Sequence, residues 1–419
     1  MTDTPIGTNS GGKPARAPTN TPASGGGSNL QASAAAAGAP TYAHWNEGGL
    51  ERRALWHPES GRQPPKRIVV IDDTCTADAA FRLASQGSSM LWRGDFHNAR
   101  QLLNAVARRI DQHRRKHLAR HGKDKAAPAT PQEAFNQHRL AQSQRANLLN
   151  AILIELDEGF GIGLHRAPDV RQACQAALGL VGEPLLLPLR ALQGMVGSFE
   201  WRNKGVAVPA LPERIHVHYG VFSPLRGEYI DLVARAPLPA TGVAVDIGTG
   251  SGVLAAVLAA RGIAKVVATD MDERALACAR ENIARLGLES RIDIVRADLF
   301  PPGRYGLIVC NPPWLPARPT SSLEHAIYDP DSAMLKGYLN GLAAHLADQG
   351  EGWLIMSDLA EHLGLRPAGF LEEAIHNAGL RVLGQLAARP RHAKAFDASD
   401  PLHEARSAEI TSLWRLGIL

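Results

Sequence analysis

The stretch VDIGTGSGVLA, residues 245–255, decides how this 419-residue chain is expected to fold. Its apolar start predicts a strand, its three glycines at alternate positions predict a tight turn, and Ser251–Ala260 is predicted to be a helix. Glycine lets the backbone adopt positive φ and lets a ligand approach the main chain closely. Ligands of open α/β sheets bind at such strand-to-helix turns, so this turn is the first candidate for a binding site.

The sequence on either side alternates between strands and helices. Strands are predicted in VAVDIG (243–248), VVATD (266–270), IDIVRAD (292–298), YGLIVC (305–310), GWLIMSD (352–358), RVLGQLAAR (381–389) and AEITSLWRL (408–416), and helices over Glu273–Leu286, Leu335–Leu346 and Leu371–Ala378. Such alternation predicts an α/β fold with a mainly parallel sheet that helices cover on both faces. No helix is predicted between the last two strands, which favours an antiparallel hairpin at one edge.

The turn carries the pattern D-x-G-x-G-x-G, formed by Asp246, Gly248, Gly250 and Gly252. A plain glycine-rich turn and a dinucleotide site are alternatives, but the spacing differs from the G-x-G-x-x-G of NAD sites. Asp270 closes the next strand, where an acidic residue can accept both ribose hydroxyls of an adenosine cofactor. The alternative for Asp270 is the N-cap of the following helix.

Two further motifs follow later strands. Asp298 ends the third strand, where its carboxylate could face an adenine amino group or simply cap a turn. Asn311-Pro312-Pro313-Trp314 comes directly after an apolar strand. The two prolines stiffen the loop, so that the Asn311 amide and a neighbouring carbonyl can hold a planar NH2 group by its two hydrogens. Trp314 can stack on a flat substrate or be a buried residue of a structural loop.

The region Val243–Trp314 resembles the class I S-adenosylmethionine-dependent methyltransferases. Within them it is similar to the small-domain group, which includes HemK-type glutamine-N5 methyltransferases of release factors and rRNA guanine-N2 methyltransferases. The four motifs occur in the order expected of this group. Upstream, FSPLRGE at 222–228 is similar to the F/I-x-P-R-x-(D/E) segment that packs near the cofactor in HemK-type enzymes. The resemblance covers about residues 215–419 and implies a Rossmann-like methyltransferase domain with S-adenosyl-L-methionine as cofactor.

The resemblance also implies roles for individual residues. Those expected to bind the cofactor are Asp246, Gly248, Thr249, Gly250, Gly252, Asp270, Met271, Asp298, Leu299 and Asn311. Those expected in the catalytic loop are Asn311, Pro312, Pro313 and Trp314, and those expected near cofactor or acceptor are Phe222, Pro224 and Arg226. The implied reaction is an in-line displacement in which the enzyme aligns the attacking nitrogen. Hydrogen bonds from the NH2 group to Asn311 and the Pro312 carbonyl are expected to activate that nitrogen without a strong general base.

The methyl acceptor stays open at this point. HemK-type enzymes usually carry Tyr after NPP and rRNA relatives often carry Phe, whereas this chain has Trp314. A macromolecular partner is expected, either a protein such as a release factor or an RNA or DNA base, which would make the protein nucleic-acid binding. Two other classes are weighed: an NAD-linked oxidoreductase, which the glycine spacing disfavours, and a non-catalytic binding module, which the intact motifs disfavour.

The first half of the chain divides by composition. Residues 1–42 are rich in small and polar residues and predict a disordered tail, because they cannot offset the entropy of ordering. Residues 43–200 predict a mostly helical domain, and 201–239 a β and helical connector to the methyltransferase domain at 240–419. The helical domain is a candidate for selecting the substrate.

Within residues 43–200 the periodicity predicts one short strand, Arg67–Asp72, and four helices. The helices are expected at about Asp95–His117, in a stretch that carries Leu140, Leu148, Leu149, Ile152 and Leu156, at Asp169–Leu180 and at Leu185–Val196. The alternation of Val206, Val208, Ile215 and Val217 in the connector predicts a small β element or a hairpin.

The net charge of +4 comes from one segment. Residues 100–125 hold nine Lys and Arg against two Asp and Glu, a local charge of +7, which leaves −3 for the rest. This run is interpreted as a solvated helix end or as an RNA contact. His113, His117 and His121 share a possible helix face in it, but the surrounding cations disfavour a metal, and no metal is expected.

The remaining composition points to a cytoplasmic protein. Four widely spaced cysteines include no C-x-x-C pair, so neither a zinc ribbon nor a disulfide framework is expected. No long apolar run and no basic, apolar leader are present in the sequence, so neither a membrane span nor a secretory signal is expected.

Overall fold

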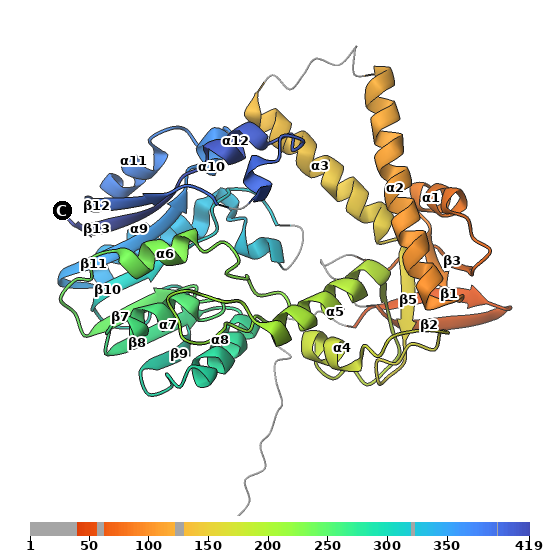
Figure 1. The fold of residues 1–419 in the computed structure, drawn as a ribbon, viewed down its shortest axis with the longest axis horizontal. Helices are drawn as coiled ribbons and strands as arrows, with labels where there is room; N and C mark the ends of the chain where they lie inside the picture. The colour runs from red at the N-terminus through yellow and green to blue at the C-terminus, as the bar shows by residue number, and fades with distance from the viewer. Residues whose placement is uncertain (1–39, 57–62, 122–129, 320–322, 392) are drawn as a thin grey trace, which may run out of the picture. The chain divides into compact units, whose positions relative to one another are not determined.

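The computed structural model describes residues 40–56, 63–121, 130–319, 323–391 and 393–419. Residues Ala39–Leu419 cluster into one compact unit. Within the described residues this unit contains a seven-stranded and a six-stranded sheet (Figure 1). The seven-stranded sheet contains the glycine motif and therefore positions the candidate site.

The seven-stranded sheet has the strand order β12-β13-β11-β10-β7-β8-β9. Its strands are β7 (Val243–Ile247), β8 (Lys265–Asp270), β9 (Ile292–Arg296), β10 (Tyr305–Cys310), β11 (Leu346–Ser357), β12 (Leu380–Ala388) and β13 (Thr411–Ile418). The pairs β11·β10, β10·β7, β7·β8 and β8·β9 are parallel, whereas β13 is antiparallel to β11 and β12. The predicted mainly parallel sheet with an antiparallel C-terminal edge is confirmed.

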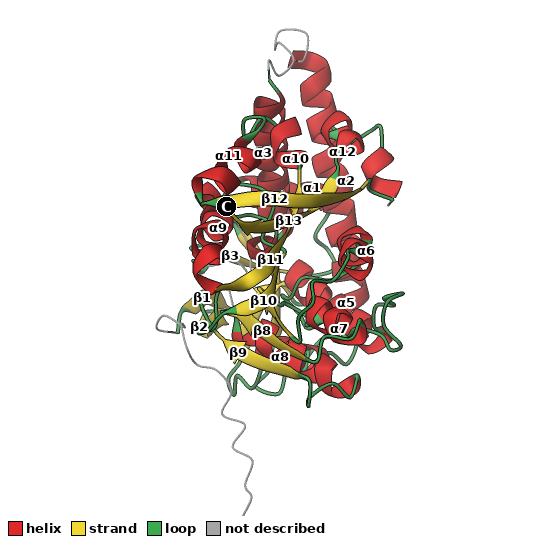
Figure 2. Ribbon diagram, turned by 90° about the vertical axis from the view of Figure 1, so that its left-hand side faces the viewer, coloured by secondary structure: helices red, strands yellow, loops and turns green. Residues whose placement is uncertain are grey.

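Helices cover both faces of this sheet (Figure 2). They are α6 (Glu228–Arg235), α7 (Val253–Ala260) and α8 (Glu273–Arg285) on one face, and α9 (Ala333–His345) and α11 (Phe370–Asn377) on the other. Successive strand residues face opposite sides, so Ala244 packs with α6 and α7 while Val245 packs with α9. The strands are therefore apolar on both faces, as buried parallel strands are.

The connection between β12 and β13 differs from the prediction. No helix was expected there, but α12 (His403–Ala408) and the 3-10 turn Ala393–Phe396 lie between the two strands. Two more 3-10 turns, Leu323–Ala326 and Pro330–Ser332, and the short helix α10 (Leu359–His362) complete this half. The antiparallel pairing of β12 with β13 is nevertheless as expected.

The first half of the chain folds around a six-stranded sheet of order β1-β2-β6-β5-β4-β3. Its strands are β1 (Tyr42–Glu47), β2 (Leu50–Trp56), β3 (Ile68–Ile71), β4 (Ser89–Trp92), β5 (Ile152–Leu156) and β6 (Leu185–Pro188). Its helices are α1 (Ala77–Ser85), α2 (Phe96–His121), α3 (Pro131–Leu149), α4 (Arg171–Leu178) and α5 (Leu189–Lys204). The region is helix-rich as predicted, and the strand expected at Arg67–Asp72 is β3.

Two other strands of this half, β5 and β6, lie where the sequence predicted helices. Ile152 and Leu156 lie in β5 rather than in the second helix, and Leu185 begins β6 rather than the last helix. Short apolar runs of four or five residues fit a buried strand and a helix segment equally well, so periodicity alone does not separate them. Leu140, expected in the core, is 60% exposed on α3.

The connector contains a β bridge between Val206 and Ile215, followed by α6, so the small β element is present without the strands of a hairpin. Helix α5 extends past residue 200, where one domain limit was predicted. The domain limits stay predictions. Residues 1–39 of the predicted disordered tail lie outside the described residues. Tyr42, the last residue of that tail, begins β1. Among the described helices, none combines the length and apolar character needed to cross a membrane.

Candidate active site

Three motif residues lie at neighbouring strand ends of the seven-stranded sheet. In the parallel register, Ile247 of β7 pairs with Thr269 of β8 and with Cys310 of β10. The next residues along these strands are Gly248, Asp270 and Asn311. The glycine loop, the acidic residue and the catalytic-loop asparagine therefore meet at the carboxyl edge of the sheet, where ligands of such sheets bind.

The glycine loop between β7 and α7 needs its glycines. Gly248, Gly250 and Gly252 have φ values of +68°, +56° and +80°, a region that residues with a Cβ rarely adopt. A Cβ on Gly248 would lie 2.9 Å from Met334 Cε of α9, and one on Gly252 would lie 3.3 Å from the Ala279 Cα of α8. The loop thus presents bare main chain between two helices.

Asp246 is buried and accepts hydrogen bonds from this loop and from helix α7, which follows it. Its side chain is 1% exposed, and its Oδ2 accepts hydrogen bonds from Thr249 Oγ1 at 2.6 Å and from the Ala255 amide at 3.0 Å. Burial raises the pKa of Asp246 to about 7, against the effect of these two donors. Asp246, predicted as a cofactor ligand, thereby supports the shape of the loop through its own side chain.

Asp270 ends β8 with its carboxylate against the loop. Oδ2 accepts from the Gly250 amide at 3.0 Å, and Oδ1 accepts from the Asp272 amide at 3.0 Å. Burial raises its pKa. The N-cap of α8 is Asp272, whose side chain accepts from the Arg274 amide at 2.8 Å. The sequence left two roles open for Asp270, cofactor binding and the N-cap of α8. In the structure the N-cap is Asp272, not Asp270.

The other predicted cofactor residues surround the same edge. The Thr249 amide donates to the Thr269 carbonyl at 2.9 Å, and Thr269 Oγ1 donates to the Leu299 carbonyl at 2.8 Å. Leu299 has a φ of +64°, so its backbone is held in an unfavourable region for a side chain with a Cβ. Met271 and Asp298 are exposed, Met271 at 53%.

The NPPW loop is fixed by an internal hydrogen bond. Trp314 Nε1 donates to Asn311 Oδ1 at 3.0 Å. An indole N–H can only donate, so this contact sets which end of the Asn311 amide is the oxygen. Pro312 is buried, Pro313 is half-buried, and Trp314 packs against the apolar clusters on both faces of the sheet. In the structure Trp314 orients Asn311, a role that the sequence analysis did not consider.

The upstream segment FSPLRGE makes contacts in two separate places of the second half of the chain. Phe222 packs on the cluster that contains α6 and α7, Pro224 is buried, and Arg226 Nη1 lies 3.9 Å from Glu409 Oε2. Glu409 is buried and accepts from Ser357 Oγ, at the carboxyl end of β11, at 2.7 Å. Burial raises the pKa of Glu409. The described contacts of Arg226 are thus to this C-terminal carboxylate rather than to the glycine loop.

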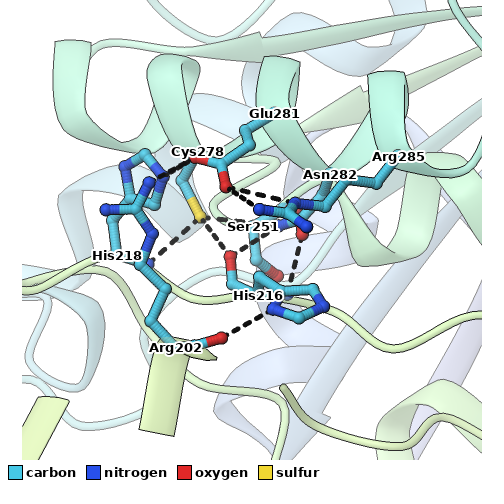
Figure 3. Close-up of polar contacts among 8 residues, drawn as sticks. All are labelled: Arg202, His216, His218, Ser251, Cys278, Glu281, Asn282 and Arg285. Atoms are coloured by element: carbon cyan, nitrogen blue, oxygen red, sulfur yellow. Dashed lines mark hydrogen bonds and ion pairs between the residues drawn. The ribbon is translucent and has the colours of Figure 1, made fainter. Parts of the chain in front are cut away.

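A polar network around α8, not foreseen from the sequence, ties the connector to the glycine loop (Figure 3). Asn282 Nδ2 donates to the His216 carbonyl at 3.0 Å and to the Ser251 carbonyl at 3.0 Å, and its Oδ1 accepts from the His216 amide at 2.7 Å. His216 Nδ1 in turn lies 2.6 Å from the Arg202 carbonyl of α5. Because Asn282 is 1% exposed, this bridge is a buried link from α5 to the loop.

Glu281 anchors the same network on its outer side (Figure 3). Its carboxylate pairs with Arg202, with His218 Nε2 at 2.7 Å and with Arg285 at 2.8 Å. Burial raises the pKa of Glu281, but Arg285, His218 and Arg202 outweigh it and lower the pKa to about 2. Burial lowers the pKa of His218 although Glu281 opposes it. The two connector histidines therefore serve structural contacts.

Open pockets among the described residues include two that no residue of the glycine loop, Asp270 or Asn311 lines, although Pro224 lines the first. One of about 360 Å³ lies in the connector against α5 and α6, beside Trp201, Arg214 and Leu225. Another of about 250 Å³ lies in the first half beside Trp92 and Asp157. Among the described residues, no three His, Cys, Asp or Glu side chains are grouped to hold a metal. The side chains of His117 and His121 lie outside the described part, and His113 contacts the Phe81 ring.

Comparison with known proteins places this site in a class. Residues 214–378 match the family model for the methyltransferase small domain. This part of the chain is therefore similar to the methyltransferase small domain, as the motifs predicted, and its cofactor is S-adenosyl-L-methionine. The match favours a methyltransferase over the NAD-linked alternative.

Some relatives of this chain are named as glutamine methyltransferases of release factors, and others as adenine methyltransferases of tRNA. The chain is 33% identical over 180 residues to a release factor glutamine methyltransferase of Cereibacter sphaeroides, covering 40% of this chain and 63% of that one. It is 28% identical over 282 residues to the enzyme of the same name from Gloeobacter violaceus, covering 62% and 90%. It is also 33% identical over 131 residues to a tRNA1(Val) (adenine(37)-N6)-methyltransferase of Bacteroides thetaiotaomicron, covering 28% and 54%.

Among solved structures, the chain is similar to a ribosomal protein L11 methylase from Lactobacillus delbrueckii subsp. bulgaricus. The TM-score is 0.34 at 20% identity, and the match covers 49% of this chain and 86% of the other.

Proposed function

We propose that this protein transfers the methyl group of S-adenosylmethionine to a nitrogen of a planar amide or exocyclic amine held by the NPPW loop. The observation that carries the proposal is the register of β7 and β10, which sets Asn311 beside Gly248. An amide side chain on a stiff loop is thereby next to a main-chain cradle. Methyl transfer requires such an arrangement, because its main demand is the alignment of acceptor and donor.

The residues of the edge fit the cofactor. Gly248 and Gly250 present main chain without a Cβ, and each Asp270 oxygen accepts one main-chain hydrogen bond. A carboxylate oxygen can accept more than one hydrogen bond, so Asp270 keeps acceptor capacity for two ribose hydroxyls. Met271, Asp298 and Leu299 are proposed to border the adenine. When bound, S-adenosylmethionine supplies an electrophilic methyl group on a positively charged sulfonium.

Asn311 and the Pro312 carbonyl are proposed to hold the acceptor NH2. The amide oxygen of Asn311 accepts one hydrogen bond from Trp314 and keeps a second lone pair for the acceptor. Accepting from the NH2 group raises the electron density on its nitrogen and stabilises the positive charge that develops during attack. The proton that then leaves the nitrogen passes to solvent, since the attack itself needs no strong base.

The acceptor is proposed to be a macromolecule, either a protein glutamine or a nucleic-acid base. Relatives named for a release factor glutamine and for a tRNA adenine both support a planar NH2 acceptor. The cytoplasmic location and the roles of Phe222, Pro224 and Arg226 near cofactor or acceptor stay predictions.

The test is transfer of labelled methyl groups. Purified protein and methyl-labelled S-adenosylmethionine are incubated with an extract from cells that lack the gene, and portions are then treated with ribonuclease, deoxyribonuclease or protease. Label removed by ribonuclease or deoxyribonuclease means a base, and label removed by protease means a protein acceptor. Cofactor binding by calorimetry without labelling of any fraction would instead favour the non-catalytic module.

A further inference from the structure

Helix α3 of the first half of the chain contacts the segment that directly follows the catalytic loop. We propose that Arg139 on α3 is a positioning residue for methyl transfer, because it fixes the described parts, 315–319 and 323–332, of the segment between the NPPW loop and helix α9. The proposal rests on the proposed function. It gives the first half of the chain a part in the geometry of the active site.

Arg139 holds both limbs of this segment at once. Its Nη2 donates to the Arg318 carbonyl at 2.7 Å and lies 3.5 Å from Glu324 Oε2. Its guanidinium carbon lies 4.2 Å from the centre of the Tyr328 ring. A planar guanidinium with five donors can bind a carbonyl and a carboxylate while it stacks on a ring, which a lysine ammonium cannot. The Arg139 side chain is only 23% exposed, so water screens these contacts less than those of a surface ion pair.

Apolar packing supports the same contact. Phe135, one helical turn before Arg139, is 4% exposed and shares a buried cluster with Leu315, Ala360 and Leu363. Leu315 is the residue directly after the NPPW motif. The side of α3 that carries Phe135 and Arg139 is therefore packed against the exit of the catalytic loop.

The two ends of the segment lead to the two halves of the site. The Leu315 amide donates to the Ile327 carbonyl at 3.2 Å, and the Asp329 amide donates to the Leu315 carbonyl at 2.8 Å. Asp329 is buried and accepts a hydrogen bond at 3.0 Å from the amide of Met334 in the first turn of α9. Met334 is the residue whose Cε lies against Gly248. A shift of the segment would therefore move the Asn311 loop at one end and the neighbour of the glycine loop at the other.

The chain offers a matched control on the same helix. Arg145 of α3 pairs with Asp111 of α2 at 3.0 Å, so this ion pair lies wholly within the first half of the chain. The variants are R139A, R139K and R145A. A 1 Å misplacement of reacting groups can cost roughly 100-fold in rate, so we expect R139A to lower transfer at saturating S-adenosylmethionine by at least about tenfold. R139K should recover part of the rate, and R145A should match the wild type.

Two readouts separate positioning from stability. Cofactor affinity by calorimetry is expected to fall by no more than about threefold in R139A, because Asp270 and the glycine main chain stay in place and only their neighbour Met334 is displaced with the segment. Hydrogen exchange at the Leu315 and Asp329 amides should be about tenfold faster in R139A, because their hydrogen bonds lose the support of the arginine. The same amides should keep their wild-type exchange rates in R145A.

Three results would overturn the proposal: unchanged transfer in R139A, unchanged exchange at both amides, or an equal loss of transfer in R145A, which would mean general destabilisation. Absence of transfer by the wild type would count against the proposed function alone. The exchange rates would still decide whether Arg139 fixes the segment, because they need no acceptor.

Discussion

At the residue scale, the contact between Trp314 and Asn311 gives the fourth residue of the NPPW motif a physical role. We expect W314F to keep most of the apolar packing and to lose the hydrogen bond that orients the Asn311 amide. A net hydrogen bond contributes about 1 kcal/mol, so transfer should fall about fivefold while cofactor affinity is unchanged. Initial rates and calorimetry on the variant test this. Wild-type turnover in W314F would mean that the Asn311 amide needs no such support.

Asp270 and Asp272 form a natural pair of variants two residues apart. D270A should weaken S-adenosylmethionine binding roughly 10- to 100-fold, because hydrogen bonds to a charged group contribute about 1.5–3 kcal/mol each. D272A removes the N-cap of α8 and should lower the unfolding free energy by about 1 kcal/mol without a comparable loss of affinity. Calorimetry and denaturant unfolding separate the two effects. Equal affinity in D270A and the wild type would remove Asp270 from the cofactor site.

The buried Asp246 predicts a pH dependence of stability. Burial raises the pKa of Asp246 to about 7 in the folded state from its ordinary value of 3.8, so the folded state binds the proton more tightly than the unfolded chain. The stabilisation from this proton is therefore complete below about pH 4 and is lost as the pH rises to about 7. Against D246N, whose amide does not titrate, the wild type should lose unfolding free energy across this window. Parallel pH curves for the two proteins would contradict the assignment.

At the scale of elements, α8 couples the connector to the glycine loop through Asn282. N282A would leave the His216 amide and the Ser251 carbonyl without a buried partner, at a cost of about 1–3 kcal/mol in unfolding free energy. We expect weaker S-adenosylmethionine binding as well, because Ser251 is part of the loop. Asn340, exposed on α9, provides the control N340A. An N282A protein with wild-type affinity would show that the loop keeps its shape without this bridge.

The elements also show which parts of the fold the sequence can predict. The second half was predicted because its strands end in local signals, such as the glycine turn before α7 and the acidic end of β8. In the first half, β5 and β6 are short apolar runs whose pairing depends on distant strands, so local periodicity assigned them to helices. Asp270 was predicted from its position after β8, but that Asp272 caps α8 became clear only from the hydrogen bonds.

At the scale of the whole molecule, long-range contacts carry what the sequence did not reveal. Arg139 meets Arg318 across 179 positions of sequence, and Arg202 meets Glu281 across 79. No local sequence pattern predicts a contact between residues this far apart in the chain. Both arginines lie in the first half of the chain, and both partners lie beside a motif of the second half. Point variants are therefore better tests of the first half than its deletion, which would expose the apolar partners of Phe135.

We propose that Asn311 holds the acceptor nitrogen next to the cofactor, and that most of the cofactor's binding energy comes from other residues. The most direct test compares the wild type with N311A in labelled methyl transfer to cell extract at saturating S-adenosylmethionine, with cofactor affinity measured on the same samples. The account predicts that N311A loses transfer by about 100-fold or more, since it removes a preorganised acceptor of the reacting NH2, while affinity changes by less than about threefold. Transfer by N311A at the wild-type rate, or loss of cofactor binding together with transfer, would contradict it.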